Sequence, residues 1–263
     1  MATTVPPALQ PLVDRAPDAL VVLDFDGTIS TIVEHPGDAT AVEGVIDTLS
    51  ELTRFITVAF VTGRPVEWLV DRTRPLADHG VEFIGLHGHE RLHGGDVVPH
   101  PESAPWRETI ELVEARVQAA APADVVVERK GLALALHYRT SPGAEQWIRT
   151  FCDEVERETG LVAHDTRYSV ELRPPVELDK GDAMRLLIDE HQPKAVVFFG
   201  DDLVDIPAVE AMRSYAEIPS AAVFIDSLEG PRAFAETADL VLTSPAAAAD
   251  ALRAVLEQLR AAA

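Results

Sequence analysis

Residues 19–28 read ALVVLDFDGT, in which five apolar residues lead directly into two aspartates spaced two apart. The apolar run is short, unbroken and contains β-branched residues, which is typical of a strand buried on both faces of a parallel sheet. Such sheets bind ligands beyond the carboxyl ends of their strands. Because side chains two apart in an extended chain point the same way, we expect Asp24 and Asp26 to address one substrate, with Gly27 and Thr28 turning the chain away behind them.

Two carboxylates in this position suit phosphoryl transfer. Asp24 can attack a phosphoryl group to give an aspartyl-phosphate, and a protonated Asp26 can protonate the leaving alkoxide and later deprotonate water. Two anions facing a dianionic substrate repel one another, so the chemistry calls for Mg²⁺. An Asp-x-Asp-Gly stretch alone is also an ordinary turn at the end of a strand, so further motifs are needed.

Three later stretches supply them. The apolar run 58–61 leads into Thr62-Gly63-Arg64, whose hydroxyl and backbone N–H groups can bind phosphate oxygens. Lys180 opens a segment with helical apolar spacing, and its ammonium can neutralise the phosphate and the nucleophile. The run 195–199 leads into Gly200-Asp201-Asp202, with Asp205 one turn on, a carboxylate cluster suited to a hard cation.

These groups, in this order along the chain, resemble the haloacid dehalogenase superfamily of phosphohydrolases. The resemblance implies that Asp24 is the nucleophile and Asp26 the general acid/base, while Thr62 and Lys180 bind phosphate. It further implies that Mg²⁺ is held by Asp24, the backbone carbonyl of Asp26 and Asp201, with Asp202 either as a direct ligand or immediately behind the ligands.

The spacing of the motifs predicts two domains. Only 35 residues separate Asp26 from Thr62, whereas 117 separate Thr62 from Lys180, far more than one crossover needs. We therefore expect an α/β fold, a haloacid dehalogenase-like doubly wound parallel sheet with a smaller α+β cap between the second and third motifs. The core domain is expected at 1–100 and 175–263, and the substrate cap at 101–174. Periodicity in the cap predicts helices at 105–120 and 143–159 and strands at 124–128, 132–138 and 169–172.

The cap also carries recognisable stretches: ERKG at 128–131, HYR at 137–139 and VELRP at 170–174. Together with DKG at 179–181 and GLHGHE at 85–90, they are similar to the trehalose-6-phosphate phosphatases. That resemblance implies hydrolysis of trehalose 6-phosphate in trehalose biosynthesis. It also implies substrate-binding roles for Glu128, Lys130, Arg139 and Glu171 in the cap and for His87 in the core. For Arg64, contact with the substrate or the cap and capping of a helix end are equal alternatives. Judged as residues alone, the four cap side chains are better explained as solvated charges on a sheet.

Alternatives stay open at this stage. Val204 and Ile206 stand where the family usually has threonine and glutamate, so another phosphorylated disaccharide, pseudo-disaccharide or sugar phosphate is an alternative substrate. A non-catalytic phosphosugar sensor is a second alternative, although Asp24, Asp26 and Lys180 are all present. Histidines at 87, 89, 93 and 100 suggest zinc only weakly, since no cysteine accompanies them and nearby glycines explain the segment as turns.

Composition limits the partners. A formal net charge of −22 argues against binding to nucleic acid or to anionic membranes. Cys152 is the only cysteine, and no stretch of about 18 apolar residues occurs. We therefore expect a cytoplasmic protein, monomeric or weakly dimeric through an alanine-rich helix at 246–263. Pro6, Pro7 and Pro11 predict an extended start to the chain.

Overall fold

The computed structural model describes residues 4–33, 36–166, 168–226 and 232–263. The chain forms two compact units, Met1–Val98 with Leu178–Ala263, and Pro99–Glu177. The second unit begins two residues before the expected cap and ends three residues after it. Its assignment as a substrate cap remains a prediction.

The first unit is built on an eight-stranded sheet in the order β12-β11-β10-β1-β2-β3-β4-β5. The strands up to β3 in this order are parallel, and β4 turns back against β3. Because the chain leaves β1 toward β2 on one side and later returns as β10 on the other, a topological switch point lies between β1 and β10, where ligands of such sheets bind. The predicted α/β class with a parallel core is confirmed. The strands are β1 (Ala19–Leu23), β2 (Thr57–Val61), β3 (Glu82–Gly85), β4 (Glu90–His93), β5 (Asp96–Pro99), β10 (Ala195–Gly200), β11 (Ser220–Ile225) and β12 (Leu240–Leu242).

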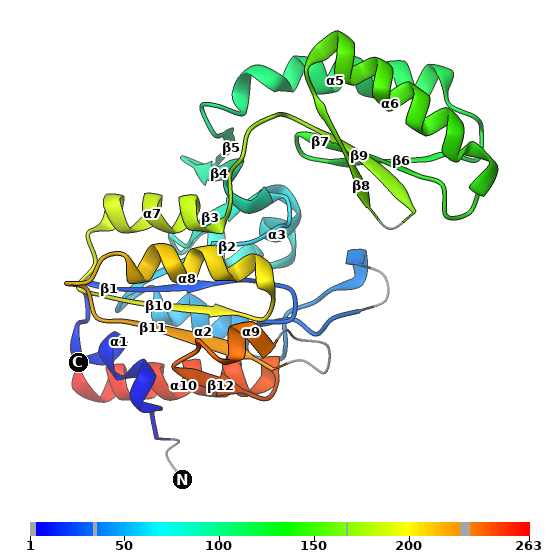
Figure 1. Ribbon diagram of the computed structural model, residues 1–263. Helices are drawn as coiled ribbons and strands as arrows, with labels where there is room; N and C mark the ends of the chain where they lie inside the picture. The colour runs from blue at the N-terminus through cyan, green and yellow to red at the C-terminus, as the bar shows by residue number, and fades with distance from the viewer. Residues whose placement is uncertain (1–3, 34–35, 167, 227–231) are drawn as a thin grey trace. The chain divides into compact units, whose positions relative to one another are not determined.

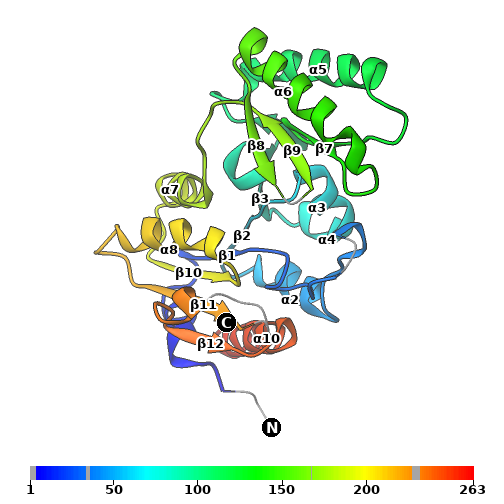
Figure 2. The same cartoon turned by 45° about the vertical axis from the view of Figure 1, so that its right-hand side comes forward.

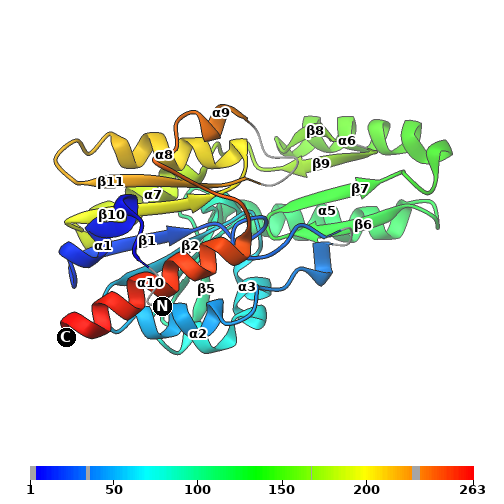
Figure 3. The same ribbon diagram turned by 90° about the horizontal axis from the view of Figure 1, so that it is seen from below.

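Helices cover both faces of this sheet (Figures 1 and 3). All of β1 is buried, with Val21 and Leu23 packed in one hydrophobic cluster and Leu20 and Val22 in another, which is why its sequence is apolar throughout. The Val21 side is covered by α1 (Gln10–Asp14), α2 (Val45–Leu52), α3 (Val66–Arg72), α4 (Arg74–Ala77) and α10 (Pro245–Ala262). The Leu20 side is covered by α7 (Lys180–His191), α8 (Ile206–Arg213) and α9 (Arg232–Ala235). Within the described ranges, no helix combines the length and apolarity that crossing a bilayer requires.

The N-terminal segment is not extended, so that prediction was wrong. Pro7 begins a 3-10 turn, Pro7–Leu9, and Pro11 is the second residue of α1. Proline is tolerated at these first helical positions because the N–H it lacks would have no partner there. Leu9 and Leu12 are fully buried against the sheet, and this burial stabilises the helical start.

The second unit is a four-stranded antiparallel sheet in the order β6-β7-β9-β8. Its strands are β6 (Val126–Lys130), β7 (Ala133–His137), β8 (Val162–Thr166) and β9 (Ser169–Arg173). Helices α5 (Arg107–Ala120) and α6 (Glu145–Thr159) pack on one face, as Figure 2 shows. Strand β8 was not expected, because the sequence VAHDT has little apolar alternation. It is held by its ladder with β9.

The buried Cys152 gives a test of this second core. Its side chain lies on α6 with 1% exposure, and burial raises the pKa of its thiol to about 12. Since the thiolate is the reactive form, we expect negligible labelling by a maleimide at pH 8 in the native protein and complete labelling in guanidinium chloride, measured by mass spectrometry. Rapid labelling of the native protein would contradict the packing of α6.

Candidate active site

Asp24 lies at the carboxyl end of β1, at the switch point of the sheet. Its backbone N–H donates to the carbonyl of Phe199 on β10 at 2.9 Å, and the residue is 6% exposed. Gly27 has φ +72°, and a Cβ placed on it would lie 1.8 Å from Oδ2 of Asp201. Only a residue without a side chain lets the Asp201 carboxylate lie against this turn, so the sequence DFDG brings the first and last motifs together.

Lys180 is almost completely buried and ion-paired twice. Its Nζ lies 2.7 Å from Oδ1 of Asp24 and 2.6 Å from Oδ1 of Asp205. Asp179 caps α7 by accepting from the N–H groups of Gly181 and Asp182, which places Lys180 at the first helical position. Burial alone would lower the pKa of Lys180, but the two carboxylates hold it above its usual value. The ammonium is therefore a permanent positive charge beside Asp24.

Asp205 holds the backbone of the last motif, Gly200-Asp201-Asp202, through hydrogen bonds. It is fully buried, and its Oδ2 accepts from the backbone N–H groups of Asp201 at 2.9 Å and Asp202 at 3.1 Å. Both of its oxygens are thus used, one by Lys180 and the other by the turn. Sequence reasoning placed Asp205 only in a general carboxylate cluster. The Asp202-x-x-Asp205 spacing, which forms a capping box in the structure, is the signal that it missed.

The carboxylates at this site fit a cation. Oxygens of Asp24, Asp201 and Asp205 lie within 4.8 Å of one another. Burial raises the pKa of Asp24 to about 6, although the nearby ammonium of Lys180 acts in the opposite direction. The pKa of Asp201 is raised to about 8, mainly by burial and further by the neighbouring carboxylates. The Asp201 carboxylate accepts no hydrogen bond within the described part of the chain, so Asp24 and Asp201 are the side chains best placed to hold a metal ion. Asp202, by contrast, is exposed and accepts from the N–H of Leu203 at 2.6 Å.

Thr62 and Arg64 follow β2, next to β1. Thr62 is 1% exposed, its Oγ1 accepts from the N–H of Arg64 at 3.3 Å, and its carbonyl accepts from the N–H of His87 at 2.9 Å. The Arg64 guanidinium forms a bidentate ion pair with Asp26, at 2.6 and 2.7 Å. Arg64, predicted as a substrate-binding residue, therefore lies directly beside the predicted acid/base.

One pocket of about 340 Å³ collects these groups. The predicted core residues that line it are Asp24, Asp26, Thr62, Arg64, His87, Lys180, Asp201 and Asp202. Ile32, Val33 and Val204 add apolar lining. Of the two departures from the family pattern, only Val204 thus borders the pocket, whereas Ile206 packs against the buried cluster of α7 and α8.

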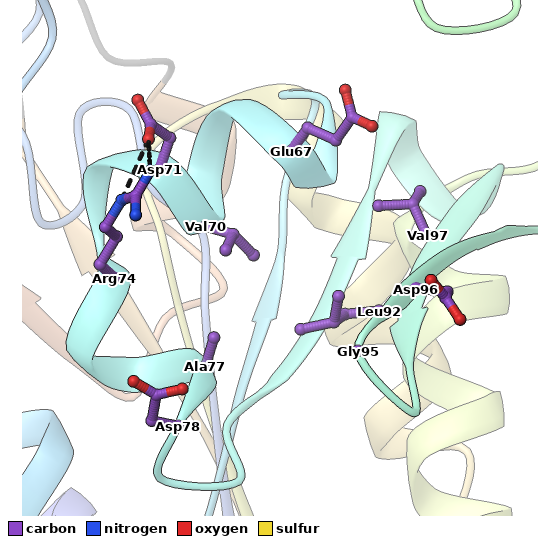
Figure 4. A pocket seen from close by; sticks show the side chains of 10 residues that line it. All are labelled: Glu67, Val70, Asp71, Arg74, Ala77, Asp78, Leu92, Gly95, Asp96 and Val97. Atoms are coloured by element: carbon purple, nitrogen blue, oxygen red, sulfur yellow. Dashed lines mark hydrogen bonds and ion pairs between the residues drawn. The ribbon is translucent and has the colours of Figure 1, made fainter.

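A larger cavity of about 480 Å³ lies elsewhere in the first unit, between α3, α4 and the β4–β5 hairpin (Figure 4). Its rim carries Glu67, Asp71, Asp78 and Asp96, and Arg74 is ion-paired with Asp71 at 2.8 Å. Both pockets are lined by four carboxylates, but the smaller one has two cations, Lys180 and Arg64, and carboxylates placed to hold a metal ion, whereas the larger one has Arg74 alone among its lining residues. The smaller pocket is therefore the candidate site for phosphate chemistry.

The predicted cap residues lie in the second unit, on or beside its sheet. Glu128, Lys130 and Glu171 share the sheet face opposite α5 and α6, with Nζ of Lys130 3.3 Å from Glu171 and 3.8 Å from Glu128. Arg139 follows β7, and its guanidinium lies 4.8 Å from the Tyr168 ring centroid. His137 also lies on the charged face, with Nε2 2.9 Å from Glu128.

Structural comparison agrees with this geometry at the level of fold. The chain is similar to a solved trehalose-6-phosphate phosphatase related protein (TM-score 0.69, 22% identity, 90% of this chain and 97% of that one). It is also similar to the Aspergillus fumigatus trehalose-6-phosphate phosphatase (TM-score 0.62, 20% identity, 95% and 96%) and to a haloacid dehalogenase-like hydrolase from Bacteroides thetaiotaomicron (TM-score 0.59, 14% identity, 89% and 98%). The protein thus has the haloacid dehalogenase-like hydrolase fold.

Sequence comparison narrows the class. A model of the trehalose-phosphatase family matches residues 22–235, and the chain belongs to that family. It is 31% identical over 259 residues to the trehalose-phosphate phosphatase of Mycobacterium tuberculosis, covering 95% of this chain and 63% of that protein. It is 35% identical over 232 residues to an uncharacterized glycosyl hydrolase of the same species, covering 80% of this chain and 17% of that protein. The chain therefore spans less than two thirds of the length of these curated relatives.

Asp201 gives a test of the cation site. In the absence of metal, its raised pKa means that the folded state binds more protons than the unfolded state between about pH 4 and 8, so stability should fall as pH rises through that window. We expect Asp201→Asn to raise the metal-free melting temperature at pH 8 by at least about 2–4 °C, which corresponds to about 1 kcal/mol.

The same experiment with Mg²⁺ completes this test. Wild-type protein should gain melting temperature with Mg²⁺, while Asp201→Asn should gain little, as measured by differential scanning fluorimetry. Asp202→Asn is the matched control, and its Mg²⁺ response should be closer to that of the wild type. An unchanged response in Asp201→Asn would exclude Asp201 as a ligand.

Proposed function

We propose that the protein is a Mg²⁺-dependent trehalose-6-phosphate phosphatase that works through an aspartyl-phosphate. The observation that supports it most directly is the meeting of Asp24, Asp26, Lys180 and Asp201 at one pocket in a member of the trehalose-phosphatase family. Each of the four has a chemical task in hydrolysing a phosphate monoester. No other set of side chains in the described ranges combines a buried carboxylate, a buried ammonium and a cation site in this way.

The first half-reaction is the attack by Asp24. Lys180 fixes the Asp24 carboxylate through Oδ1 before the substrate arrives. An oxygen of Asp24 forms a bond to phosphorus while the bond from phosphorus to the sugar oxygen breaks, and Asp26 donates a proton to that leaving oxygen. Thr62 and Lys180 hold the phosphoryl oxygens. Mg²⁺ held by Asp24 and Asp201 would offset the negative charges of the carboxylates and the phosphate.

The second half-reaction regenerates the protein. Asp26, now ionised, takes a proton from water, and the water oxygen attacks phosphorus as the bond from phosphorus to Asp24 breaks. Inorganic phosphate leaves, and Asp26 again holds the proton. Asp24 and Asp26 lie two residues apart at one strand end, which is the arrangement that allows nucleophile and acid/base to serve the same phosphorus.

For the second unit we propose the role of a substrate cap. Its open sheet face carries Glu128, Lys130 and Glu171, and charged groups make the stronger hydrogen bonds to sugar hydroxyls. Arg139 beside the sheet is a fourth candidate. Val204 at the pocket favours one alternative, a phosphatase for another phosphorylated disaccharide or sugar phosphate, since a valine cannot form the hydrogen bonds of a threonine.

Phosphate release tests the chemistry. With Mg²⁺ we expect release from trehalose 6-phosphate to exceed that from glucose 6-phosphate, sucrose 6-phosphate and p-nitrophenyl phosphate, and EDTA to abolish it. Asp24→Asn should lower kcat by at least about a thousandfold because it removes the nucleophile, while substrate binding measured by calorimetry persists. Equal activity on all esters would contradict the assigned substrate. Full binding by a wild-type protein that releases no phosphate would instead support the sensor alternative.

The sheet face of the second unit gives a separate test. We expect Glu171→Gln to raise KM for trehalose 6-phosphate by about tenfold, because one charge-assisted hydrogen bond to a sugar hydroxyl is weakened, and to leave hydrolysis of p-nitrophenyl phosphate unchanged. Glu158→Gln on the exposed side of α6 is the matched control. Equal losses of activity on both substrates would show that Glu171 does not bind the sugar.

A further inference from the structure

Arg64 is held from two sides. Its guanidinium binds both carboxylate oxygens of Asp26, with Nε 2.6 Å from Oδ2 and Nη2 2.7 Å from Oδ1. Its Cζ also lies 4.3 Å from the ring centroid of Trp68, on the first helical turn of α3. A planar guanidinium can stack on an aromatic face while its edge donates a pair of hydrogen bonds.

Trp68 is itself braced against the nucleophile segment. Its ring meets the ring of Phe25 edge-on, with centroids 5.4 Å apart at 84°. Phe25 is fully buried, and in the sequence it stands between Asp24 and Asp26. A second guanidinium, that of Arg72, lies 5.0 Å from the Trp68 centroid, but it pairs with Asp71 and the carbonyl of Gly37 rather than with Asp26. The ring thus links α3 to the strand end that carries both catalytic candidates.

The ion pair conflicts with the work proposed for Asp26. A general acid must carry a proton on one oxygen and present it to the leaving group, and both oxygens of Asp26 are occupied by Arg64. The pair has to open during each turnover. A phosphate ester entering this pocket brings oxygens that accept the same two parallel hydrogen bonds from a guanidinium as a carboxylate does. It therefore competes directly with Asp26 for Arg64.

We propose that Arg64 is transferred from Asp26 to the incoming phosphate ester, and that Trp68 is the positioning residue that keeps its guanidinium within reach of both. The transfer frees Asp26 only when substrate is present. Stacking suits this task because the attraction to a ring face persists when the guanidinium turns or slides in its own plane. The inference rests on the proposed phosphatase function for its kinetic consequences, but not for its effect on phosphate binding.

Binding of inorganic phosphate, measured by calorimetry on the full chain with Mg²⁺, tests the transfer without turnover. If Asp26 competes for Arg64, Asp26→Asn should bind phosphate about tenfold more tightly than the wild type, since the ion pair between Arg64 and Asp26 no longer has to be broken. In an Arg64→Met background the same change should give little gain. A comparable gain in both backgrounds would reflect only the removal of a negative charge and would overturn the proposal.

A double-mutant cycle tests the role of Trp68. Trp68→Leu should lower kcat/KM by about three- to thirtyfold, and Trp68→Phe, which keeps a ring, should lose less. If Trp68 acts through Arg64, Trp68→Leu should cost nothing further in the Arg64→Met background. Arg72→Met removes the other guanidinium from the same ring and should leave kcat/KM unchanged. Additive losses, with melting temperatures equal to that of the wild type, would overturn the positioning role.

The two measurements separate the proposals. If no phosphate ester is hydrolysed but Asp26→Asn strengthens phosphate binding only when Arg64 is present, the proposed function fails and the transfer of Arg64 stands. If esters are hydrolysed and the gain in binding does not depend on Arg64, the function stands and the transfer fails.

Discussion

The buried ammonium of Lys180, held between Asp24 and Asp205, is the interaction on which this site depends. Removing a charged amine from water costs several kcal/mol unless it is paired and fully hydrogen-bonded. Its partners come from the end of β1 and from the turn after β10, while Lys180 itself begins α7. The pairing therefore joins three elements that are far apart in the chain. Loss of either carboxylate would leave a buried charge uncompensated, so the geometry of the nucleophile and the stability of this edge of the sheet are coupled.

The same cluster explains how an acidic chain can receive an anionic substrate. With a net charge of −22 the protein as a whole repels phosphate. The pocket counters this locally with Lys180 and Arg64. Burial raises the pKa values of Asp24 and Asp201, with neighbouring carboxylates adding to the effect, and a divalent cation held there would offset their negative charge. The larger cavity beside α3 and α4 is lined by as many carboxylates but by a single cation, Arg74, and none of its carboxylates belongs to the group that could hold a metal ion, which makes the smaller pocket the better host for phosphate.

The parts of the fold that could be predicted from the sequence are those that a short stretch of residues determines by itself. The unbroken runs that became β1 and β10 end in polar residues at the sheet edge, and the motif residues follow them directly. Strand β8 escaped prediction because its ladder with β9, rather than its own pattern, makes it a strand. The ion pair of Arg64 with Asp26 joins residues 38 positions apart, and no local pattern encodes it. The proline-rich start was wrongly predicted because burial of Leu9 and Leu12 outweighs the extended preference of prolines.

The two departures from the family pattern differ in consequence because they lie on opposite sides of one short turn. Ile206 points into the core under α7 and α8, where an apolar side chain gains from burial and a glutamate would need a partner. Val204 is 49% exposed and borders the pocket. The ion pairs of Lys180 and the turn held by Asp205 do not involve either side chain. In the proposed mechanism the groups that act on the phosphate are thus independent of both side chains, and of the two departures only Val204 is placed to alter the substrate preference.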